Sequence, residues 1–87
     1  MKKILFDNNK NVVSATIKNL RQQHNMTQDQ LAARMQTMGV NIDQQMISRI
    51  ENNRRFVTDY ELACFSRIFH IPVADLLMEF YQKYTDA

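Results

Sequence analysis

The sequence predicts an all-α fold, a small bundle of short helices joined by short connections. The chain has 87 residues, of which only one is Gly and one is Pro, while 45% are apolar. This is the composition neither of a disordered chain nor of a loop-rich one. Apolar residues recur at helical spacing, and capping boxes at Thr27 and Thr58 mark two helix starts. The length corresponds to one domain with a modest core.

Residues 1–11 are expected to form an N-terminal arm ahead of a helical domain at 12–84. The arm holds a short apolar cluster, Ile4-Leu5-Phe6, and then a polar run from Asp7 to Asn11. It is either a flexible arm or a short strand that pairs with a partner. The opening resembles a signal peptide only briefly, because Asp7 interrupts the apolar core, and no run is long enough to span a bilayer. We therefore expect a cytoplasmic protein.

Two helices are expected in the first half of the domain. Ser14 is the expected N-cap of a helix that runs to about His24, and Asn25 tolerates the left-handed conformation that ends helices. Thr27 and Gln30 form the capping box of the next helix, at about 27–38. The apolar residues expected to face the core are Ile17, Leu20, Leu31, Ala32, Met35 and Met38.

The segment 43–52 is predicted to be a short helix with two chemically different faces. Asp43 is a suitable N-cap for it. At about 100° of rotation per residue, Met46, Ile47 and Ile50 share an apolar face. The opposite face carries amide, hydroxyl and guanidinium groups, which can recognise base edges in a DNA major groove: Gln44, Gln45, Ser48, Arg49 and Asn52. Met46 either packs inward, which we favour, or covers a thymine methyl group.

The last part of the domain is expected to hold two more helices. Thr58 and Glu61 form the capping box of a helix that runs to about Phe69, with Leu62, Phe65, Ile68 and Phe69 as core candidates. Cys64 stands alone in the sequence and is expected to pack as a small apolar side chain. Pro72 interrupts the pattern, and a last helix is expected from about Val73 to Tyr81.

The net charge of +2 is unevenly distributed. Residues 1–57 carry nine Lys or Arg and four acids, whereas residues 58–87 carry two Lys or Arg and five acids. A positive first part suits a polyanion such as DNA on one side of the domain. An ordinary solvated surface explains the same asymmetry about as well.

Taken together, these motifs resemble the lambda-repressor/Cro-type (XRE-like) helix-turn-helix family. The resemblance covers about residues 13–78 and is carried by Ile17-Lys18-Asn19-Leu20-Arg21, Met26-Thr27-Gln28-Asp29-Gln30-Leu31-Ala32, Ile47-Ser48-Arg49-Ile50-Glu51-Asn52 and Ile71-Pro72-Val73-Ala74-Asp75-Leu76-Leu77. It implies a five-helix DNA-binding domain whose recognition helix, at about 43–52, enters the major groove of double-stranded DNA.

The resemblance also assigns roles to individual residues. It implies base contacts by Gln44, Gln45, Ser48 and Arg49, and contacts to DNA phosphates by Thr27, Gln28, Arg54 and Arg55. The chemistry agrees, because Gln can pair with adenine and Arg with guanine through two hydrogen bonds. Arg21 and Glu51 match a pair that forms a salt bridge in similar repressors, so we expect Arg21 to stabilise the fold and not to contact DNA.

The sequence departs from the family pattern in two places. The stretch from Thr27 to Ile47 is longer than usual by about five residues, with 36–40 as the surplus. This extra length puts the position of the recognition helix in the groove in question. Pro72 also replaces the Ser that usually caps the last helix.

The predicted function is sequence-specific DNA binding by a small regulator of transcription of the repressor type, as in bacterial or phage proteins. An enzyme is not expected, because His24 and His70 belong to no ligand-spaced or triad-like motif and no Gly-rich phosphate loop occurs. We expect no cofactor, no metal site and no small-molecule ligand. The alternative is a protein-interaction module or antitoxin that keeps the fold. Excess apolar residues at 76–84 suggest a homodimer, with Ile4-Leu5-Phe6 as a second candidate contact.

Overall fold

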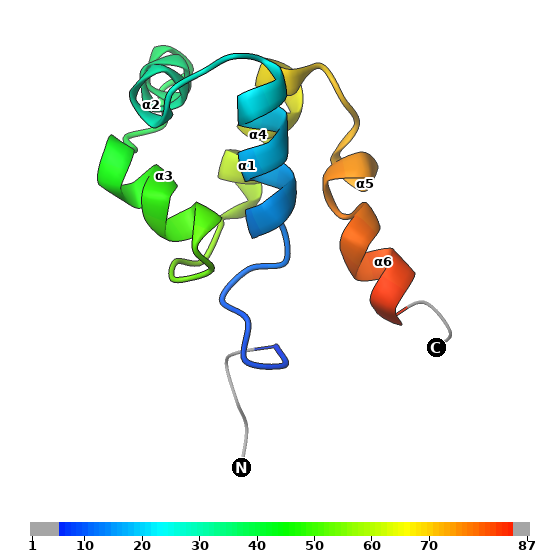
Figure 1. Cartoon of the computed structure of the whole chain (residues 1–87). Coiled ribbons are helices and arrows are strands. Elements are labelled where there is room, and N and C mark those ends of the chain that lie inside the picture. Colours follow the sequence, from blue (N-terminus) through cyan, green and yellow to red (C-terminus); the bar gives the residue numbers. More distant parts are fainter. Residues whose placement is uncertain (1–5, 85–87) are drawn as a thin grey trace.

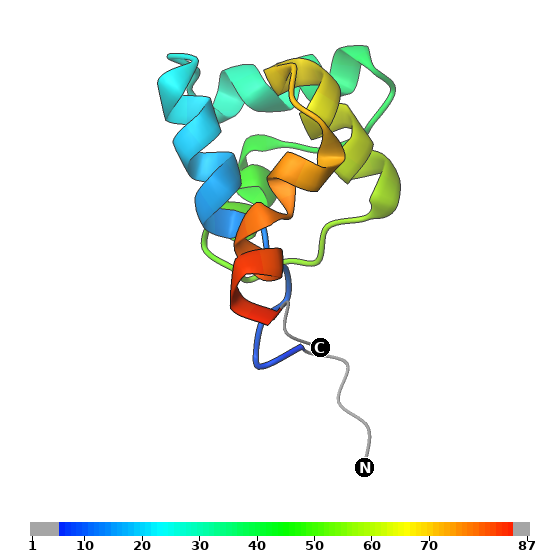
Figure 2. The same cartoon turned by 90° about the vertical axis from the view of Figure 1, so that its right-hand side faces the viewer.

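Six helices follow one another along residues 6–84, the part of the chain that the computed structural model describes. In Figure 1, α2 and α3 lie on one side of α1, α4 lies behind it, and α5 and α6 lie on the other side. Figure 2 shows α5 and α6 crossing in front of the other helices. The all-α prediction is confirmed: the helices are α1 (Ser14–Gln23), α2 (Gln28–Thr37), α3 (Gln44–Glu51), α4 (Asp59–Phe69), α5 (Val73–Leu76) and α6 (Met78–Tyr84).

A single apolar core joins the first five helices. Ile17 of α1, Ile47 of α3 and Phe65 of α4 are fully buried within it. Burial of a large apolar side chain contributes roughly 1.5–3 kcal/mol, so this core is the main stabilising feature of so small a domain. Its other buried members are Val13, Leu31, Ala32, Met35, Val40, Ile42, Ile50, Cys64, Ile68, Phe69 and Leu76.

The expected caps of three helices are confirmed. Thr27 accepts from the backbone N–H of Gln30 at 3.1 Å, and Thr58 accepts from that of Glu61 at 3.2 Å, each in a reciprocal capping box. Asp43 caps α3 through the backbone N–H of Met46 at 2.8 Å. These bonds satisfy donors that the first turn of a helix leaves without a partner.

Two expectations about the helix ends are wrong. Ser14 does not cap α1 but is its first residue; the N-cap is Val13, which makes no side-chain cap bond. The side chain of Asn11 accepts from the Val13 N–H at 3.0 Å instead. Met38 does not face the core and is 37% exposed. The reason is that α2 ends at Thr37, so its helical spacing does not extend to Met38.

The long connection between α2 and α3 is pinned to the core. It comprises residues 38–43 and turns at Gly39, whose φ of +86° is readily adopted only by glycine. Val40 and Ile42 then bury their side chains. Gln36 also donates to the Ile42 carbonyl at 2.8 Å. The connection therefore holds α3 in place through two buried anchors, Val40 and Ile42.

The last predicted helix consists of two pieces. Leu77 has φ −96° and ψ 6°, which breaks the helix between α5 and α6 and raises the expected five helices to six. Pro72 stands at the N-cap of α5 without a side-chain cap bond. After the break, the Phe80 ring of α6 lies 5.5 Å from the Phe6 ring. Among the described residues, no helix is long and apolar enough to cross a membrane.

Residues 6–9 of the N-terminal segment form a tight turn. The backbones of Phe6 and Asn9 exchange hydrogen bonds at 3.2 and 2.7 Å. Between them, Asp7 and Asn8 adopt positive φ of 50° and 64°, a conformation that suits two-residue turns. The expected contacts of Ile4 and Leu5 concern residues outside the described part of the chain.

Candidate nucleic-acid interface

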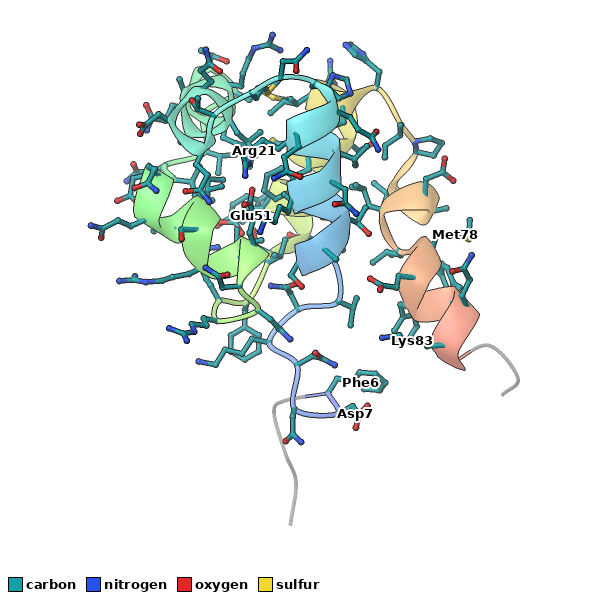
Figure 3. All side chains as sticks on the ribbon, in the orientation of Figure 1. Phe6, Asp7, Arg21, Glu51, Met78 and Lys83 are labelled. Carbon is teal, nitrogen blue, oxygen red and sulfur yellow. The ribbon has the colours of Figure 1, made fainter. Side chains whose placement is uncertain are left out.

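A buried ion pair joins α1 to α3. Arg21 donates to Glu51 through Nε at 2.6 Å and through Nη2 at 3.1 Å, and its Nη1 donates to the Met26 carbonyl at 2.8 Å. The two side chains are 12% and 2% exposed, and Figure 3 shows them between the two helices. The hydrogen bond to Glu51 raises the pKa of Arg21 above its ordinary value. This is the pair implied by the resemblance, and it fixes the orientation of α3.

The same carboxylate connects to the exposed face of α3 through Gln28. The Gln28 side chain donates to Glu51 Oε1 at 3.0 Å, and its carbonyl accepts from Gln44 Nε2 at 2.6 Å. An amide has two N–H donors and one carbonyl acceptor. The bond to Gln28 uses one donor of Gln44, which leaves its second donor and its carbonyl for a further partner.

The other polar side chains of α3 lie beside Gln44 and extend toward solvent. Gln45 and Arg49 are exposed, and neither makes a side-chain hydrogen bond to another described residue. Ser48 is partly buried and accepts from Asn52 at a long 3.4 Å. On the predicted DNA-reading face, Gln44 is therefore held by one hydrogen bond. The neighbouring side chains of Gln45 and Arg49 are available for hydrogen bonds to DNA.

Two of the residues predicted to contact phosphates, Thr27 and Arg54, have hydrogen-bond donors that are not used within the domain. Thr27, at the start of α2, uses its hydroxyl oxygen as a cap acceptor, so the hydroxyl proton can still be donated. Arg54 follows α3 and is exposed. Its backbone N–H bonds to the Arg49 carbonyl at 2.7 Å, which closes the helix and fixes where the side chain departs.

Arg55 has a role within the fold that sequence reasoning missed. Its guanidinium pairs with Glu61, whose side chain is 4% exposed. The hydrogen bond to Glu61 raises the pKa of Arg55. Burial alone would raise the pKa of Glu61, but the bonds from Arg55 and from the Thr58 N–H outweigh it and lower that pKa. The signal was present in the sequence: Glu61 is the third residue of a capping box, with one oxygen left for a cation.

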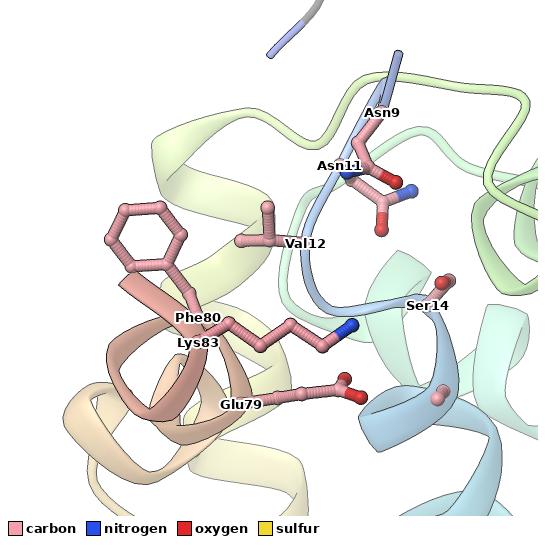
Figure 4. A pocket seen from close by; sticks show the side chains of 8 residues that line it. Asn9, Asn11, Val12, Ser14, Glu79, Phe80 and Lys83 are labelled. Atoms are coloured by element: carbon pink, nitrogen blue, oxygen red, sulfur yellow. The ribbon is translucent and has the colours of Figure 1, made fainter. Parts of the chain in front are cut away.

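Away from α3, the described residues form a pocket but no candidate metal site. A pocket of about 140 Å³ lies between the N-terminal segment and α6, lined by residues that include Asn9, Ser14 and Lys83 (Figure 4). Within the described residues, no three His, Cys, Asp or Glu side chains gather into a group that could hold a metal ion. Cys64 is buried and unpaired with another cysteine.

Comparison with known proteins assigns the architecture. The model of a family described as "Helix-turn-helix" matches residues 17–76, from within α1 to the end of α5. No curated protein and no solved structure matches the chain. The matched range contains the Arg21–Glu51 pair, the Gln28–Gln44 bond and the polar face of α3. The chain belongs to the lambda-repressor/Cro-type (XRE-like) family of DNA-binding helix-turn-helix domains.

Proposed function

We propose that the protein is a repressor-type regulator of transcription that reads specific DNA sequences with α3 in the major groove. The observation that carries the proposal is the solvent-facing polar edge of α3, held in place by bonds from two other helices. A helix that is fixed to its domain and presents uncommitted donors and acceptors can recognise base edges without a large ordering cost.

The available groups of α3 match the hydrogen-bonding patterns of two bases. The second N–H and the carbonyl of Gln44 can bond adenine N7 and N6 together, and the guanidinium of Arg49 can bond guanine O6 and N7. Gln45 and Ser48 complete the proposed set of base contacts. Each well-placed double contact discriminates against the wrong base by about 1–3 kcal/mol.

The proposed phosphate contacts divide into two groups. Thr27 and Arg54 have donors free for DNA. Gln28 and Arg55 are committed to Glu51 and Glu61, so we assign them mainly to holding the interface in shape. Contacts to phosphates position a protein on DNA without reading its sequence.

The function is tested by fluorescence-anisotropy titration of the chain against genomic fragments from around its own gene, at two salt concentrations. We expect the logarithm of the binding constant to fall linearly with the logarithm of the salt concentration, because Lys and Arg side chains displace counterions from DNA. Absence of binding at low salt, or binding without a salt slope, contradicts the proposal.

Two variants separate the proposed roles within the interface. Gln44→Ala should reduce the preference for the best fragment over an unrelated one, whereas Arg54→Ala should weaken both by the same factor. Selection of bound fragments from a genomic library would identify the DNA sequence that the protein prefers. If Gln44→Ala leaves the preference unchanged, the base-reading role of Gln44 is wrong.

We further propose that the protein acts as a homodimer through α6, because paired domains read operators with two half-sites. Met78 and Tyr81 of α6 are each 44% exposed and lie three residues apart, on one side of the helix. The same apolar surface favours the second candidate function, a protein-interaction module or antitoxin. Analytical ultracentrifugation of Tyr81→Glu against the unaltered chain tests the dimer. If Tyr81→Glu abolishes the regulatory activity of the protein while Gln44→Ala does not, the protein-interaction module is favoured.

A further inference from the structure

The described part of the N-terminal arm, residues 6–11, is bonded to the C-terminal end of α3. The side-chain oxygen of Asn53 accepts from the backbone N–H groups of Lys10 and Asn11, at 2.9 and 3.1 Å. The Asn53 amide nitrogen donates to the side chain of Asn9 at 2.5 Å. Residues more than 40 positions apart in sequence are therefore joined by direct side-chain bonds.

Asn11 completes the attachment from the other side. Its amide nitrogen donates to the carbonyls of Ile50 and Arg55, both at 3.0 Å. Ile50 lies in the last turn of α3, and its carbonyl also accepts from the Asn53 N–H at 3.1 Å. We call Asn9, Asn11 and Asn53 the asparagine cluster. It ties the arm both to α3 and to the loop that carries Arg54.

The cluster places one cation beside the proposed DNA surface. Lys10 is exposed, and its own backbone N–H is one of the groups that Asn53 holds. Lys10 also borders a hollow of about 270 Å³ whose other walls include Phe56 and Val57, just after Arg54 and Arg55. At its far end the arm is positioned by the contact between the Phe6 and Phe80 rings.

We propose that Lys10 is a DNA-backbone contact and that Asn53 is the residue that positions it, so that the arm forms part of the nucleic-acid interface. This inference rests on the proposed DNA-binding function. A compact ammonium suits a phosphate as a point charge, and one strand presents a phosphate about every 3.4 Å along the helix axis. Lys10 and Arg54 thus supply cations to the backbone from two adjoining segments.

The contact is tested with Lys10→Gln, titrated against a mixed-sequence DNA duplex over a range of salt concentrations. We expect affinity to fall and the salt slope to become shallower by about 0.9, the value for one lost phosphate contact. The matched control is Arg67→Gln, which removes an exposed cation in the last turn of α4 and should leave the slope unchanged.

The positioning role is tested by repeating Lys10→Gln in two glycine backgrounds. Asn53 has a φ of 60°, which glycine also adopts, so Asn53→Gly removes the side chain without straining the backbone. Asn25→Gly is the control, since Asn25 has a φ of 57° on the α1–α2 turn. We expect the effect of Lys10→Gln to disappear with Asn53→Gly and to persist with Asn25→Gly. Asn53→Asp keeps acceptor oxygens for the N–H groups of Lys10 and Asn11. In this background, Lys10→Gln should again weaken DNA binding.

The outcomes distinguish this inference from the function on which it rests. If the unaltered chain does not bind DNA, both are overturned. If it binds with a salt slope that Lys10→Gln does not change, only the Lys10 contact is overturned. If the effect of Lys10→Gln is equal in both glycine backgrounds, the asparagine cluster serves only to stabilise the fold. The proposal that Asn53 positions Lys10 is then overturned.

Discussion

Arg55 donates to the carboxylate of Glu61 with both terminal nitrogens of its guanidinium, at 2.9 and 3.0 Å. Arg55 Nη1 also donates to the Phe56 carbonyl at 2.9 Å. Glu61 in turn accepts from the Thr58 N–H at 3.0 Å. A cation just past α3 is thus joined to the first turn of α4, and this bond holds the intervening loop and the point where the Arg54 side chain departs.

Replacing Arg55 with Ala should destabilise the fold far more than replacing Arg54. The change leaves the Glu61 carboxylate buried without its cation, and we expect a loss of about 3 kcal/mol, the low end of the range for a broken buried pair. The low end applies because the Arg55 side chain is 23% exposed. Arg54→Ala should stay within about 0.5 kcal/mol. Urea denaturation measures both, and equal small losses would contradict the structural role of Arg55.

The same ion pair should make stability sensitive to acid. The pKa of Glu61 lies below its ordinary value of 4.5 in the folded protein. The charged pair therefore stabilises the fold above that value, and its contribution disappears as pH falls through the lowered pKa. We expect the melting temperature to fall more steeply below about pH 4.5 in the unaltered chain than in Glu61→Gln. Asp59→Asn, an exposed site in the same turn, is the control and should keep the steep fall.

Arg21→Ala should lower the melting temperature strongly, because it leaves Glu51 buried beside the core without its cation. A loss of about 3 kcal/mol corresponds to roughly 12 °C or more in a domain of this size. Gln22→Ala changes the next residue of α1, which is exposed, and serves as the reference. Thermal denaturation followed by circular dichroism gives both values. A fall no larger than that of the reference would show that the pair contributes little.

Gln28→Ala should alter sequence preference although we do not assign Gln28 to a base. Its carbonyl orients Gln44, so its removal should relax the preference at the base pair affected by Gln44→Ala. The double variant Gln28→Ala with Gln44→Ala should lose no more of this preference than either single variant. Gln45→Ala should affect a different base pair. Binding to a set of single-base-pair operator variants measures these effects. A Gln28→Ala protein with unchanged preference would show that Gln44 needs no support.

The sequence predicted those features that depend on neighbouring residues. The caps at Thr27, Asp43 and Thr58 were predictable because each bond closes within three residues. The left-handed Asn25 follows from a similarly local preference of Asn. The Arg21–Glu51 pair spans 30 positions, and only the family resemblance pointed to it.

Features that depend on distant contacts were missed. Ser14 is a suitable capping residue, but α1 begins at Ser14 itself, after Asn11 has bonded the Val13 N–H and the Ile50 carbonyl, 39 positions away. The break at Leu77 likewise has no Gly or Pro to announce it. Arg55 was assigned to a DNA phosphate because it matches the family pattern after the recognition helix, although Glu61, the carboxylate that binds it, lies only six positions away.

The bonds of Asn11 also bear on how this domain can be joined to others. A fusion made at residue 12, where the helical pattern begins, would delete the amide that bonds the Ile50 and Arg55 carbonyls. It would also remove the Lys10 N–H that Asn53 holds. As a transferable module, the unit therefore begins ahead of its first helix, at the turn that starts with Phe6. A partner domain placed upstream would therefore connect near this turn, where the Phe6 ring packs against Phe80 of α6.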